Sequence, residues 1–279
     1  MITFPPISNI IQVDMLPLEI EEMILNRVAE IDDLRHITLN ACSLVCRAFL
    51  PICRKYIFGT IVLQYFRDPD KDTKPLIDAF ERLLRETPEI ADYIHNLDYN
   101  IREEDLTIPS IQLEESFKRI SKLKSLSIWN DLCLEFSWDD NPIRPALLHL
   151  LHLPTLTHLT MNRINDFVVS DLTPCVNLKY MDIGNFMTVV DEDTFPAVLP
   201  EKSIQLDEFV SGMGTSEFIM ELCSAQRPDG LPIIDFKSLS RLRVCPAILE
   251  EPYEGEDLEI SQELLRHCQV LTEITISCK

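Results

Sequence analysis

Cysteine and histidine are the residues of this sequence whose type and spacing come nearest to reactive chemistry. Cys42, Cys46 and Cys53 share one helical stretch, and His149 and His152 are separated by about one helical turn. Thiolates and imidazoles bind zinc, so both sets are candidate ligands. The cysteine spacing fits no common zinc pattern, and the two histidines lie among leucines, which is typical of a helix packed under a strand. The sequence therefore predicts no metal site.

The sequence also lacks the motifs that position catalytic groups. It contains no Gly-x-Ser-x-Gly turn, no phosphate-binding loop, no His-Glu-x-x-His and no Cys-x-x-Cys. Only 6 glycines occur in 279 residues, and phosphate loops and strained nucleophile turns both depend on glycine. We therefore expect no catalytic residue, no cofactor and no enzymatic activity. A hydrolase is the least favoured class, because no nucleophile can be paired with a base.

Acidic residues are concentrated in the later part of the chain. Residues 1–58 hold five basic and seven acidic residues, so residues 59–279 carry −19 of the formal net charge of −21. An acidic surface repels nucleic acid and anionic membranes and favours a basic partner. We expect neither nucleic acid nor a membrane as partner. For the dense acidic segment at 250–259, a solvated loop is a better interpretation than a recognition site.

Other features are typical of an intracellular protein. No run approaches the roughly 18 apolar residues that a membrane-spanning helix requires. The opening residues, Met-Ile-Thr-Phe-Pro-Pro-Ile, lack the basic region and apolar core of a secretory signal. The nine cysteines are odd in number, and several stand in apolar segments, so we expect free buried thiols. These observations predict a cytoplasmic or nuclear location.

Residues 14–58 carry the signals of three short helices. Pro17 suits a first helical turn, because its missing N–H would be unpaired there, and the glutamates that follow suit the positive end of the helix dipole. A second helix is expected over 34–41. A third is expected to begin with Ser43 as its cap and to run until Pro51 starts another turn. Three short helices bury little surface alone, so a leftover apolar face predicts a partner or docking onto the rest of the chain.

The order of residues in this region resembles the F-box. Leu16-Pro17-Leu18-Glu19-Ile20 is similar to its Leu-Pro-x-Glu opening, and 44–49 to its closing Leu-Val-Cys-Arg-x-aromatic helix. Residues 53–58 resemble the continuation seen in many fungal F-box proteins. The resemblance implies a helical module over 12–60 that binds a Skp-family adaptor and, through it, a cullin. It assigns adaptor binding to Leu16, Pro17, Leu18, Ile20, Ile24, Leu44, Val45 and Phe49.

Residues 61–279 repeat a phrase in which the first, fourth and sixth residues are mostly apolar. Its seven copies begin at Ile94, Leu123, Leu156, Leu178, Leu206, Leu239 and Leu271. A spacing of about 30 residues with one short strand per unit is typical of a leucine-rich repeat. Because side chains alternate along a strand, the fourth and sixth residues should point inward and those between them outward.

Helical patterns lie between several phrases, for example at 146–153 and 260–268. A strand-like stretch, 60–63, and an amphipathic helix precede the first phrase. The apolar face of that helix is expected to be Leu76, Phe80, Leu83 and Leu84. The predicted fold class is therefore α/β, with an N-terminal three-helix F-box module followed by an irregular leucine-rich-repeat-like β/α solenoid of about seven strand units.

The outward strand positions are the candidates for binding a target, because repeat proteins bind partners on such rows of side chains. Trp129 and Tyr180 are the expected anchors, since aromatic and arginine side chains dominate binding hot spots. For Trp129, a place in the core fits its residue type equally well. The candidate target-binding residues are Trp129, His158, Tyr180, Arg241 and Arg243.

The favoured function is substrate recognition for a Skp–cullin–F-box ubiquitin ligase. The F-box would bind the Skp adaptor, and the repeat body would hold a protein target of unknown identity. Such a chain contributes proximity and performs no chemistry itself. The alternative is a leucine-rich-repeat-like scaffold or interaction protein with no role in ubiquitin transfer.

Overall fold

A computed structural model describes residues 17–29, 35–45, 47–63, 74–101, 111–130, 137–185, 187–190, 195–245 and 264–276. The chain divides into two compact units, an N-terminal unit of residues 1–58 and a body of residues 59–279. The boundary expected from the sequence lay two residues later, between 60 and 61.

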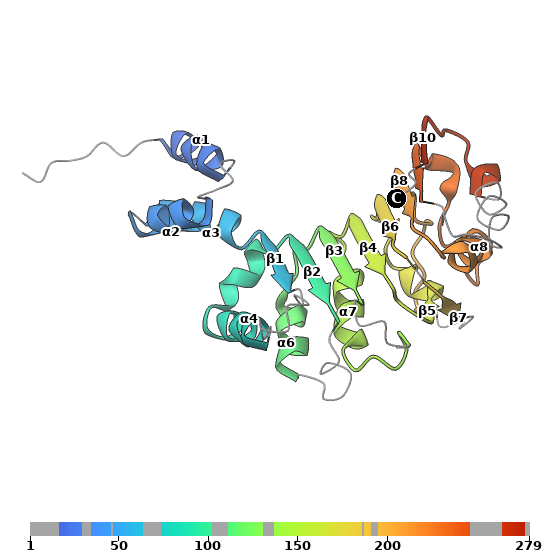
Figure 1. Ribbon diagram of the computed structural model, residues 1–279, viewed down its shortest axis with the longest axis horizontal. Helices are drawn as coiled ribbons and strands as arrows, with labels where there is room; N and C mark the ends of the chain where they lie inside the picture. Colours follow the sequence, from blue (N-terminus) through green and yellow to red (C-terminus); the bar gives the residue numbers. More distant parts are fainter. Residues whose placement is uncertain are drawn as a thin grey trace, which may run out of the picture. The chain divides into compact units, whose positions relative to one another are not determined.

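Three helices form the described part of the N-terminal unit (Figure 1). They are α1 (Leu18–Ala29), α2 (Arg35–Val45) and α3 (Phe49–Ile57). Pro17 immediately precedes α1, and its carbonyl accepts hydrogen bonds from the backbone N–H groups of Ile20 and Glu21 at 2.9 and 3.1 Å. A proline at this place loses no helical hydrogen bond, because the first N–H groups of a helix have no partner within it.

The second and third helices differ from their expected boundaries. Ser43 does not cap a new helix, because it lies near the end of α2 and its Oγ donates to the carbonyl of Asn40 at 2.6 Å. α3 begins instead at Phe49 and takes Pro51 into its first turn. The prediction was wrong because a serine hydroxyl can bond back to its own helix as readily as it caps the next one.

The core of the N-terminal unit is small. Leu25 from α1, Leu39 from α2, and Ile52 and Cys53 from α3 are buried together. Phe49 packs against this cluster and is half-buried. A core of this size stabilises a unit of three short helices only modestly.

The body is built on an eight-stranded parallel sheet whose strands follow one another in chain order (Figure 1). The strands are β1 (Thr60–Leu63), β2 (Asn96–Asn100), β3 (Ser125–Trp129), β4 (His158–Asn162), β6 (Tyr180–Ile183), β8 (Glu208–Ser211), β9 (Arg241–Val244) and β10 (Glu273–Ile276). A second, small sheet pairs β5 (Phe167–Val168) with β7 (Val189–Val190). All seven repeated phrases and the stretch 60–63 are thus strands. The predicted α/β class and parallel pairing are confirmed.

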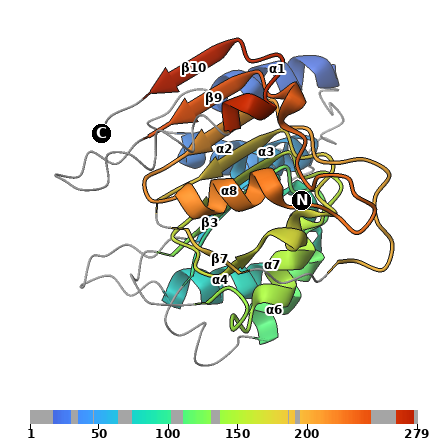
Figure 2. The ribbon, with the colours of Figure 1, turned by 90° about the vertical axis from the view of Figure 1, so that its right-hand side faces the viewer.

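Helices cover one face of this sheet. In Figure 1, α4 (Lys74–Glu86), α6 (Ile111–Arg119) and α7 (Arg144–Leu151) lie side by side on that face. Figure 2, turned by 90°, shows α8 (Ser216–Ser224) in front of the strands. The 3-10 helices η2 (Pro88–Tyr93), η3 (Val169–Leu172) and η4 (Phe236–Ser238) complete the described connections. The helical pattern predicted at 146–153 is confirmed by α7. That at 260–268 is described only from 264 onward, where 264–267 are helical.

The strand register aligns equivalent residues of successive phrases. Leu97, Leu126, Leu159, Met181, Phe209 and Leu242 pair in sequence across six strands, and all are buried. Residues two positions later also point toward the helices, and the ring of Tyr99 lies 5.2 Å from that of Phe117 in α6. The expected inward positions are therefore correct for these strands.

Three inward positions of the repeated phrases are not buried. Val244 is half-buried, and Ile274 and Ile276 are 53% and 68% exposed. β10 is one of the two edge strands of the sheet, so no further strand unit of the described residues packs on it. The expected face of α4 also needs a correction. Leu76 is exposed, and Ile77 joins Phe80 and Leu84 in the core, since these three share one helical face.

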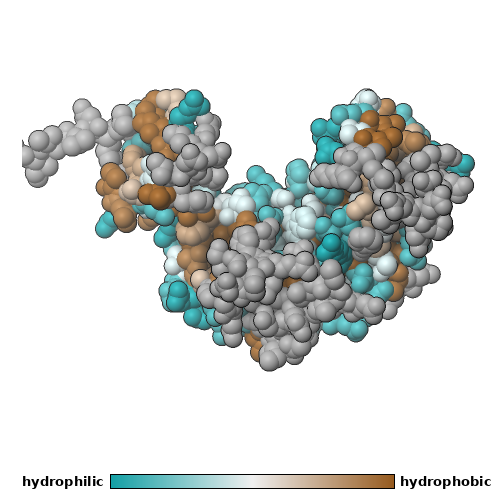
Figure 3. Space-filling model, in the orientation of Figure 1, coloured by the Kyte–Doolittle hydropathy of each residue, from teal (hydrophilic) through white to brown (hydrophobic). Residues whose placement is uncertain are grey.

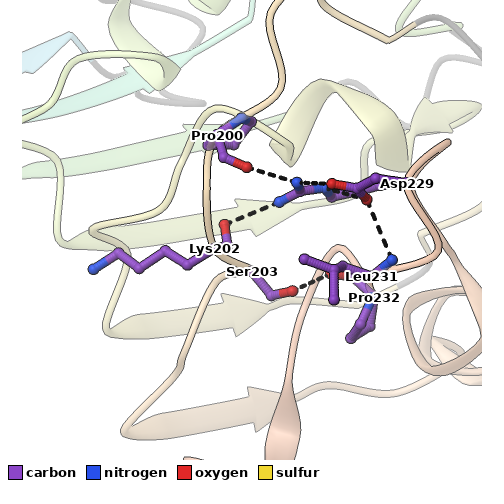
Figure 4. Close-up of polar contacts among 7 residues, drawn as sticks. Pro200, Lys202, Ser203, Asp229, Leu231 and Pro232 are labelled. Carbon is purple, nitrogen blue, oxygen red and sulfur yellow. Dashed lines mark hydrogen bonds and ion pairs between the residues drawn. The ribbon is translucent and has the colours of Figure 1, made fainter.

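A buried arginine fastens two loops of the body together. The guanidinium of Arg227 donates to the carbonyl oxygens of Pro200 and Lys202 at 2.6 and 3.0 Å and pairs with the carboxylate of Asp229 (Figure 4). The side chain of Arg227 is only 2% exposed. These contacts tie the loop before β8 to the loop before β9, and they account for the burial of a charged residue.

Candidate functional site

The N-terminal unit exposes apolar side chains on α1 and α2. Leu44 and Val45, at the end of α2, are 87% and 72% exposed. Others exposed on these helices are Ile20, Met23, Ile24 and Ile37. Figure 3 shows hydrophobic surface over this unit. Single exposed apolar residues are ordinary, but several on one small unit indicate an interaction surface.

α1 explains how such a surface can coexist with a core. Its inward side is formed by Leu25, which is fully buried, and by Glu21. Ile20 and Ile24 lie on another side of the same helix and stay exposed. The exposed surface of α1 on this side also includes Met23, Asn26 and Arg27. α1 thus buries Leu25 inside the unit and leaves Ile20 and Ile24 exposed.

The residues expected to bind an adaptor fall into three groups. Pro17, Ile20, Ile24, Leu44 and Val45 are exposed. Phe49 packs against the small core instead, so its side chain contributes to the stability of the unit. Leu16 and the side chain of Leu18 lie outside the described residues. Sequence reasoning missed Met23 and Ile37 as surface residues, although their place in a short helix with excess apolar residues was a usable signal.

The face of the sheet opposite α4, α6 and α7, here named the open face, carries the outward strand positions. The rings of His158 and Tyr180 stack there with their centroids 5.5 Å apart. Arg241 and Arg243 both approach Glu208, at 2.8 and 3.8 Å. These five side chains come from four strands, β4, β6, β8 and β9, and meet because the strands are neighbours in the sheet.

A groove of about 620 Å³ lies on the open face, here named the open-face groove. Its walls include Trp129, Thr160, Asn162, Asp182, Asn185 and Arg243. Trp129 is half-buried, so the alternative that placed it in the core is wrong. Trp138 is the fully buried tryptophan, and its indole N–H donates to Asp171 at 2.9 Å.

Two glycines and two asparagines shape the groove. Gly184 and Gly212 line it. A Cβ at Gly184 would lie 2.4 Å from Cγ of Asn162, and one at Gly212 would lie 2.9 Å from Oδ1 of Asn185. Oδ1 of Asn162 accepts a hydrogen bond from the backbone N–H of Asn185 at 3.1 Å. Oδ1 of Asn185 in turn accepts one from the backbone N–H of Met213 at 3.0 Å. A side chain at Gly184 or Gly212 would therefore collide with one of these asparagine amides, so glycine is required at both positions.

Asp182 and Tyr180 form the main titratable pair at the groove. The hydroxyl of Tyr180 donates to Oδ2 of Asp182 at 3.3 Å. Burial, with the nearby charge of Asp182, raises the pKa of Tyr180 to about 12. Burial also raises the pKa of Asp182, while the hydrogen bond from Tyr180 and the charge of Arg243 act in the opposite direction. Asp182 is thus a carboxylate whose charge is incompletely compensated within the groove.

The five predicted target-binding residues are brought onto one surface. Trp129 and Arg243 line the groove, while His158, Tyr180 and Arg241 occupy the adjoining column of the open face. Asn185, Glu208 and the two groove glycines were missed. The glycines had a signal, because both directly follow a predicted strand in a chain with only 6 glycines.

Several of the remaining histidine and cysteine side chains contact backbone carbonyl oxygens. In the described ranges, no three histidine, cysteine or acidic side chains gather as metal ligands. His149 and His152 place Nε2 at 3.3 and 2.8 Å from the carbonyl oxygens of Ile120 and Asp171. Burial, with the charge of Asp171, raises the pKa of the Cys175 thiol, which disfavours the reactive thiolate. No helix within the described part of the chain is long and apolar enough to cross a membrane.

No protein-family model matches the chain, and no curated protein matches it.

Proposed function

We propose that this chain is a substrate receptor of a Skp–cullin–F-box ubiquitin ligase. The N-terminal unit would act as an F-box that binds the Skp-family adaptor, and the body would act as a leucine-rich-repeat-like solenoid that holds a protein target on its open face. The chain performs no chemistry in this role, and it works in the cytoplasm or nucleus. Its effect is to raise the effective concentration of target lysines near the ubiquitin-loading enzyme.

One observation carries the proposal. Leu44 and Val45, which match the Leu-Val of the F-box closing motif, are among the most exposed apolar side chains of the described residues. Placing two such side chains in water gains nothing for the fold, and burying them on a partner contributes roughly 1.5–3 kcal/mol per side chain. Their exposure beside Ile20 and Ile24 therefore supports a protein-binding role for this unit.

Binding of a purified Skp-family adaptor tests the proposal. The wild-type chain should retain the adaptor in a pull-down, and the double variant Leu44→Ser/Val45→Ser should lose it. Val198→Ser/Leu231→Ser is the matched control, because these two exposed apolar residues belong to the body. If the folded wild-type chain retains no adaptor, the F-box assignment fails.

The scaffold alternative is separated by a second assay. Ubiquitylation of a bound protein that requires both the cullin and Leu44/Val45 supports the receptor role. Adaptor binding with no cullin-dependent transfer to any bound protein would favour the scaffold.

A further inference from the structure

We propose that the open-face groove binds an extended peptide segment of the target that carries a lysine or arginine side chain, which lies between Trp129 and Asp182. This inference rests on the proposed function, since it specifies what the same body recognises. It assigns a chemical class to the target and a role to each wall of the groove.

Charge on the open face favours a cationic ligand. The outward positions of the eight strands hold four acidic residues and two arginines: Asp98, Asp182, Glu208, Glu273, Arg241 and Arg243. Both arginines approach Glu208, so neither is an isolated cation ready to receive an anion. The body as a whole carries −19. A basic segment is therefore attracted, and an acidic or phosphorylated one is repelled.

Asp182 gives this attraction a specific place. Its carboxylate lines the groove and receives one hydrogen bond, from Tyr180. Because burial disfavours the charge of Asp182, an arriving ammonium or guanidinium group stabilises the carboxylate more than it would in open water. A charge-assisted hydrogen bond in this partly dehydrated position is stronger than a neutral one.

Trp129 and the two asparagines supply the remaining contacts. The half-buried indole lines the groove, and a cation is attracted to such a ring when it lies within about 6 Å of the ring face. Oδ1 of Asn162 and Oδ1 of Asn185 each accept a hydrogen bond from a backbone N–H. The Nδ2 group of each asparagine can then donate to solvent or to a peptide carbonyl oxygen. Two amide donors on neighbouring strand units match an extended main chain better than they match a single ion.

Fluorescence anisotropy with two labelled peptides tests the proposal on the full chain. The probes are fluorescein-labelled repeats of Gly-Ser-Lys and of Gly-Ser-Glu. The variants are Asp182→Asn and Asp140→Asn. Asp140 is exposed and lies before α7, away from the groove lining. Both variants change the net charge equally, so diffuse attraction to the acidic body affects them alike.

The lysine peptide should bind the wild type in preference to the glutamate peptide. Asp182→Asn should weaken that binding about tenfold or more, and Asp140→Asn should leave it within about twofold. Trp129→Ala should weaken it as well, and a cooperative thermal unfolding transition in each variant would show that it is folded. Equal effects of the two aspartate variants, preference for glutamate, or no binding up to about 1 mM peptide would overturn the proposal. Any of these results together with intact adaptor binding would remove the ligand class and leave the proposed function standing.

Discussion

The two units of this chain use their apolar residues in opposite ways. The N-terminal unit buries a cluster of four apolar residues and leaves Leu44 and Val45 in water. The body buries the inward residues of strand after strand and presents tryptophan, asparagine and charged residues on its open face. Under the proposed function, the difference corresponds to two kinds of recognition. A surface that is apolar before binding suits a stable protein partner, whereas a polar groove suits selection among targets.

The largest expected effect lies in the body core. Leu126→Ala, Leu159→Ala and Leu242→Ala should each lower the free energy of unfolding by about 2–5 kcal/mol, because these side chains are buried. Ser127 and Thr160, which point to the open face, should tolerate alanine within about 0.5 kcal/mol. Urea unfolding measures both sets, and equal losses would show that the two strand faces are assigned wrongly.

A smaller loss is expected at the loop clamp. Arg227→Met preserves bulk but removes the donors to Pro200, Lys202 and Asp229, and should lower the free energy of unfolding by about 2–3 kcal/mol. The hydrogen bond from Arg227 lowers the pKa of Asp229, so the Asp229 contribution is present above the unfolded-state pKa and is lost as pH falls through the folded-state value. Thermal unfolding between neutral and acidic pH checks this. A variant as stable as the wild type at neutral pH would contradict the role of the clamp.

Asp182→Asn should raise the free energy of unfolding at neutral pH, whereas the preceding substitutions lower it. Because burial raises the pKa of Asp182, the charged form destabilises the fold at neutral pH, and this cost disappears below the unfolded-state pKa. The asparagine variant should be slightly more stable at neutral pH, by less than about 1 kcal/mol after solvent screening, and should lose this advantage in acid. Melting temperatures measured across that pH range give the answer. A loss of stability at neutral pH would mean that Asp182 is a structural residue.

The smallest effect on stability is expected at the most exposed apolar pair. Leu44→Ser/Val45→Ser removes side chains that contribute little to the core, so the free energy of unfolding should change by about 0.5 kcal/mol or less. Circular dichroism during heating measures it. A large loss would place the pair in the internal packing of the unit and remove the main support for a partner surface.

The sequence predicted the strands well because their signal is local and repeated. Leu126 and Ile128 alternate with Ser125 and Ser127, and a similar alternation returns in most units, so both the strands and their buried faces could be assigned. β8 is an exception, because its outward Val210 is apolar and its inward Ser211 is polar. Helix limits in the N-terminal unit were harder. Ser43 has two local hydrogen-bonding options, and only tertiary packing selects between them.

The candidate site was predictable in some of its residues but not in its geometry. The outward positions identified Trp129 and Arg243 as surface residues. The pairing of Arg241 with Glu208 depends on which strands become neighbours, and the fit of Asn162 over Gly184 depends on backbone spacing. Neither follows from the spacing of residues along the chain.

One pair of titrations tests most directly the claim that the N-terminal unit binds the adaptor and the body binds the target. A purified Skp-family adaptor and the lysine peptide are each titrated into the wild type, Leu44→Ser/Val45→Ser and Asp182→Asn. The account predicts that Leu44→Ser/Val45→Ser lowers adaptor affinity by about 100-fold, or roughly 2.7 kcal/mol, and keeps peptide binding. It predicts that Asp182→Asn keeps adaptor binding and lowers affinity for the lysine peptide by about tenfold or more. If either variant weakens both ligands equally while remaining folded, the two surfaces are not separate, and the account is contradicted.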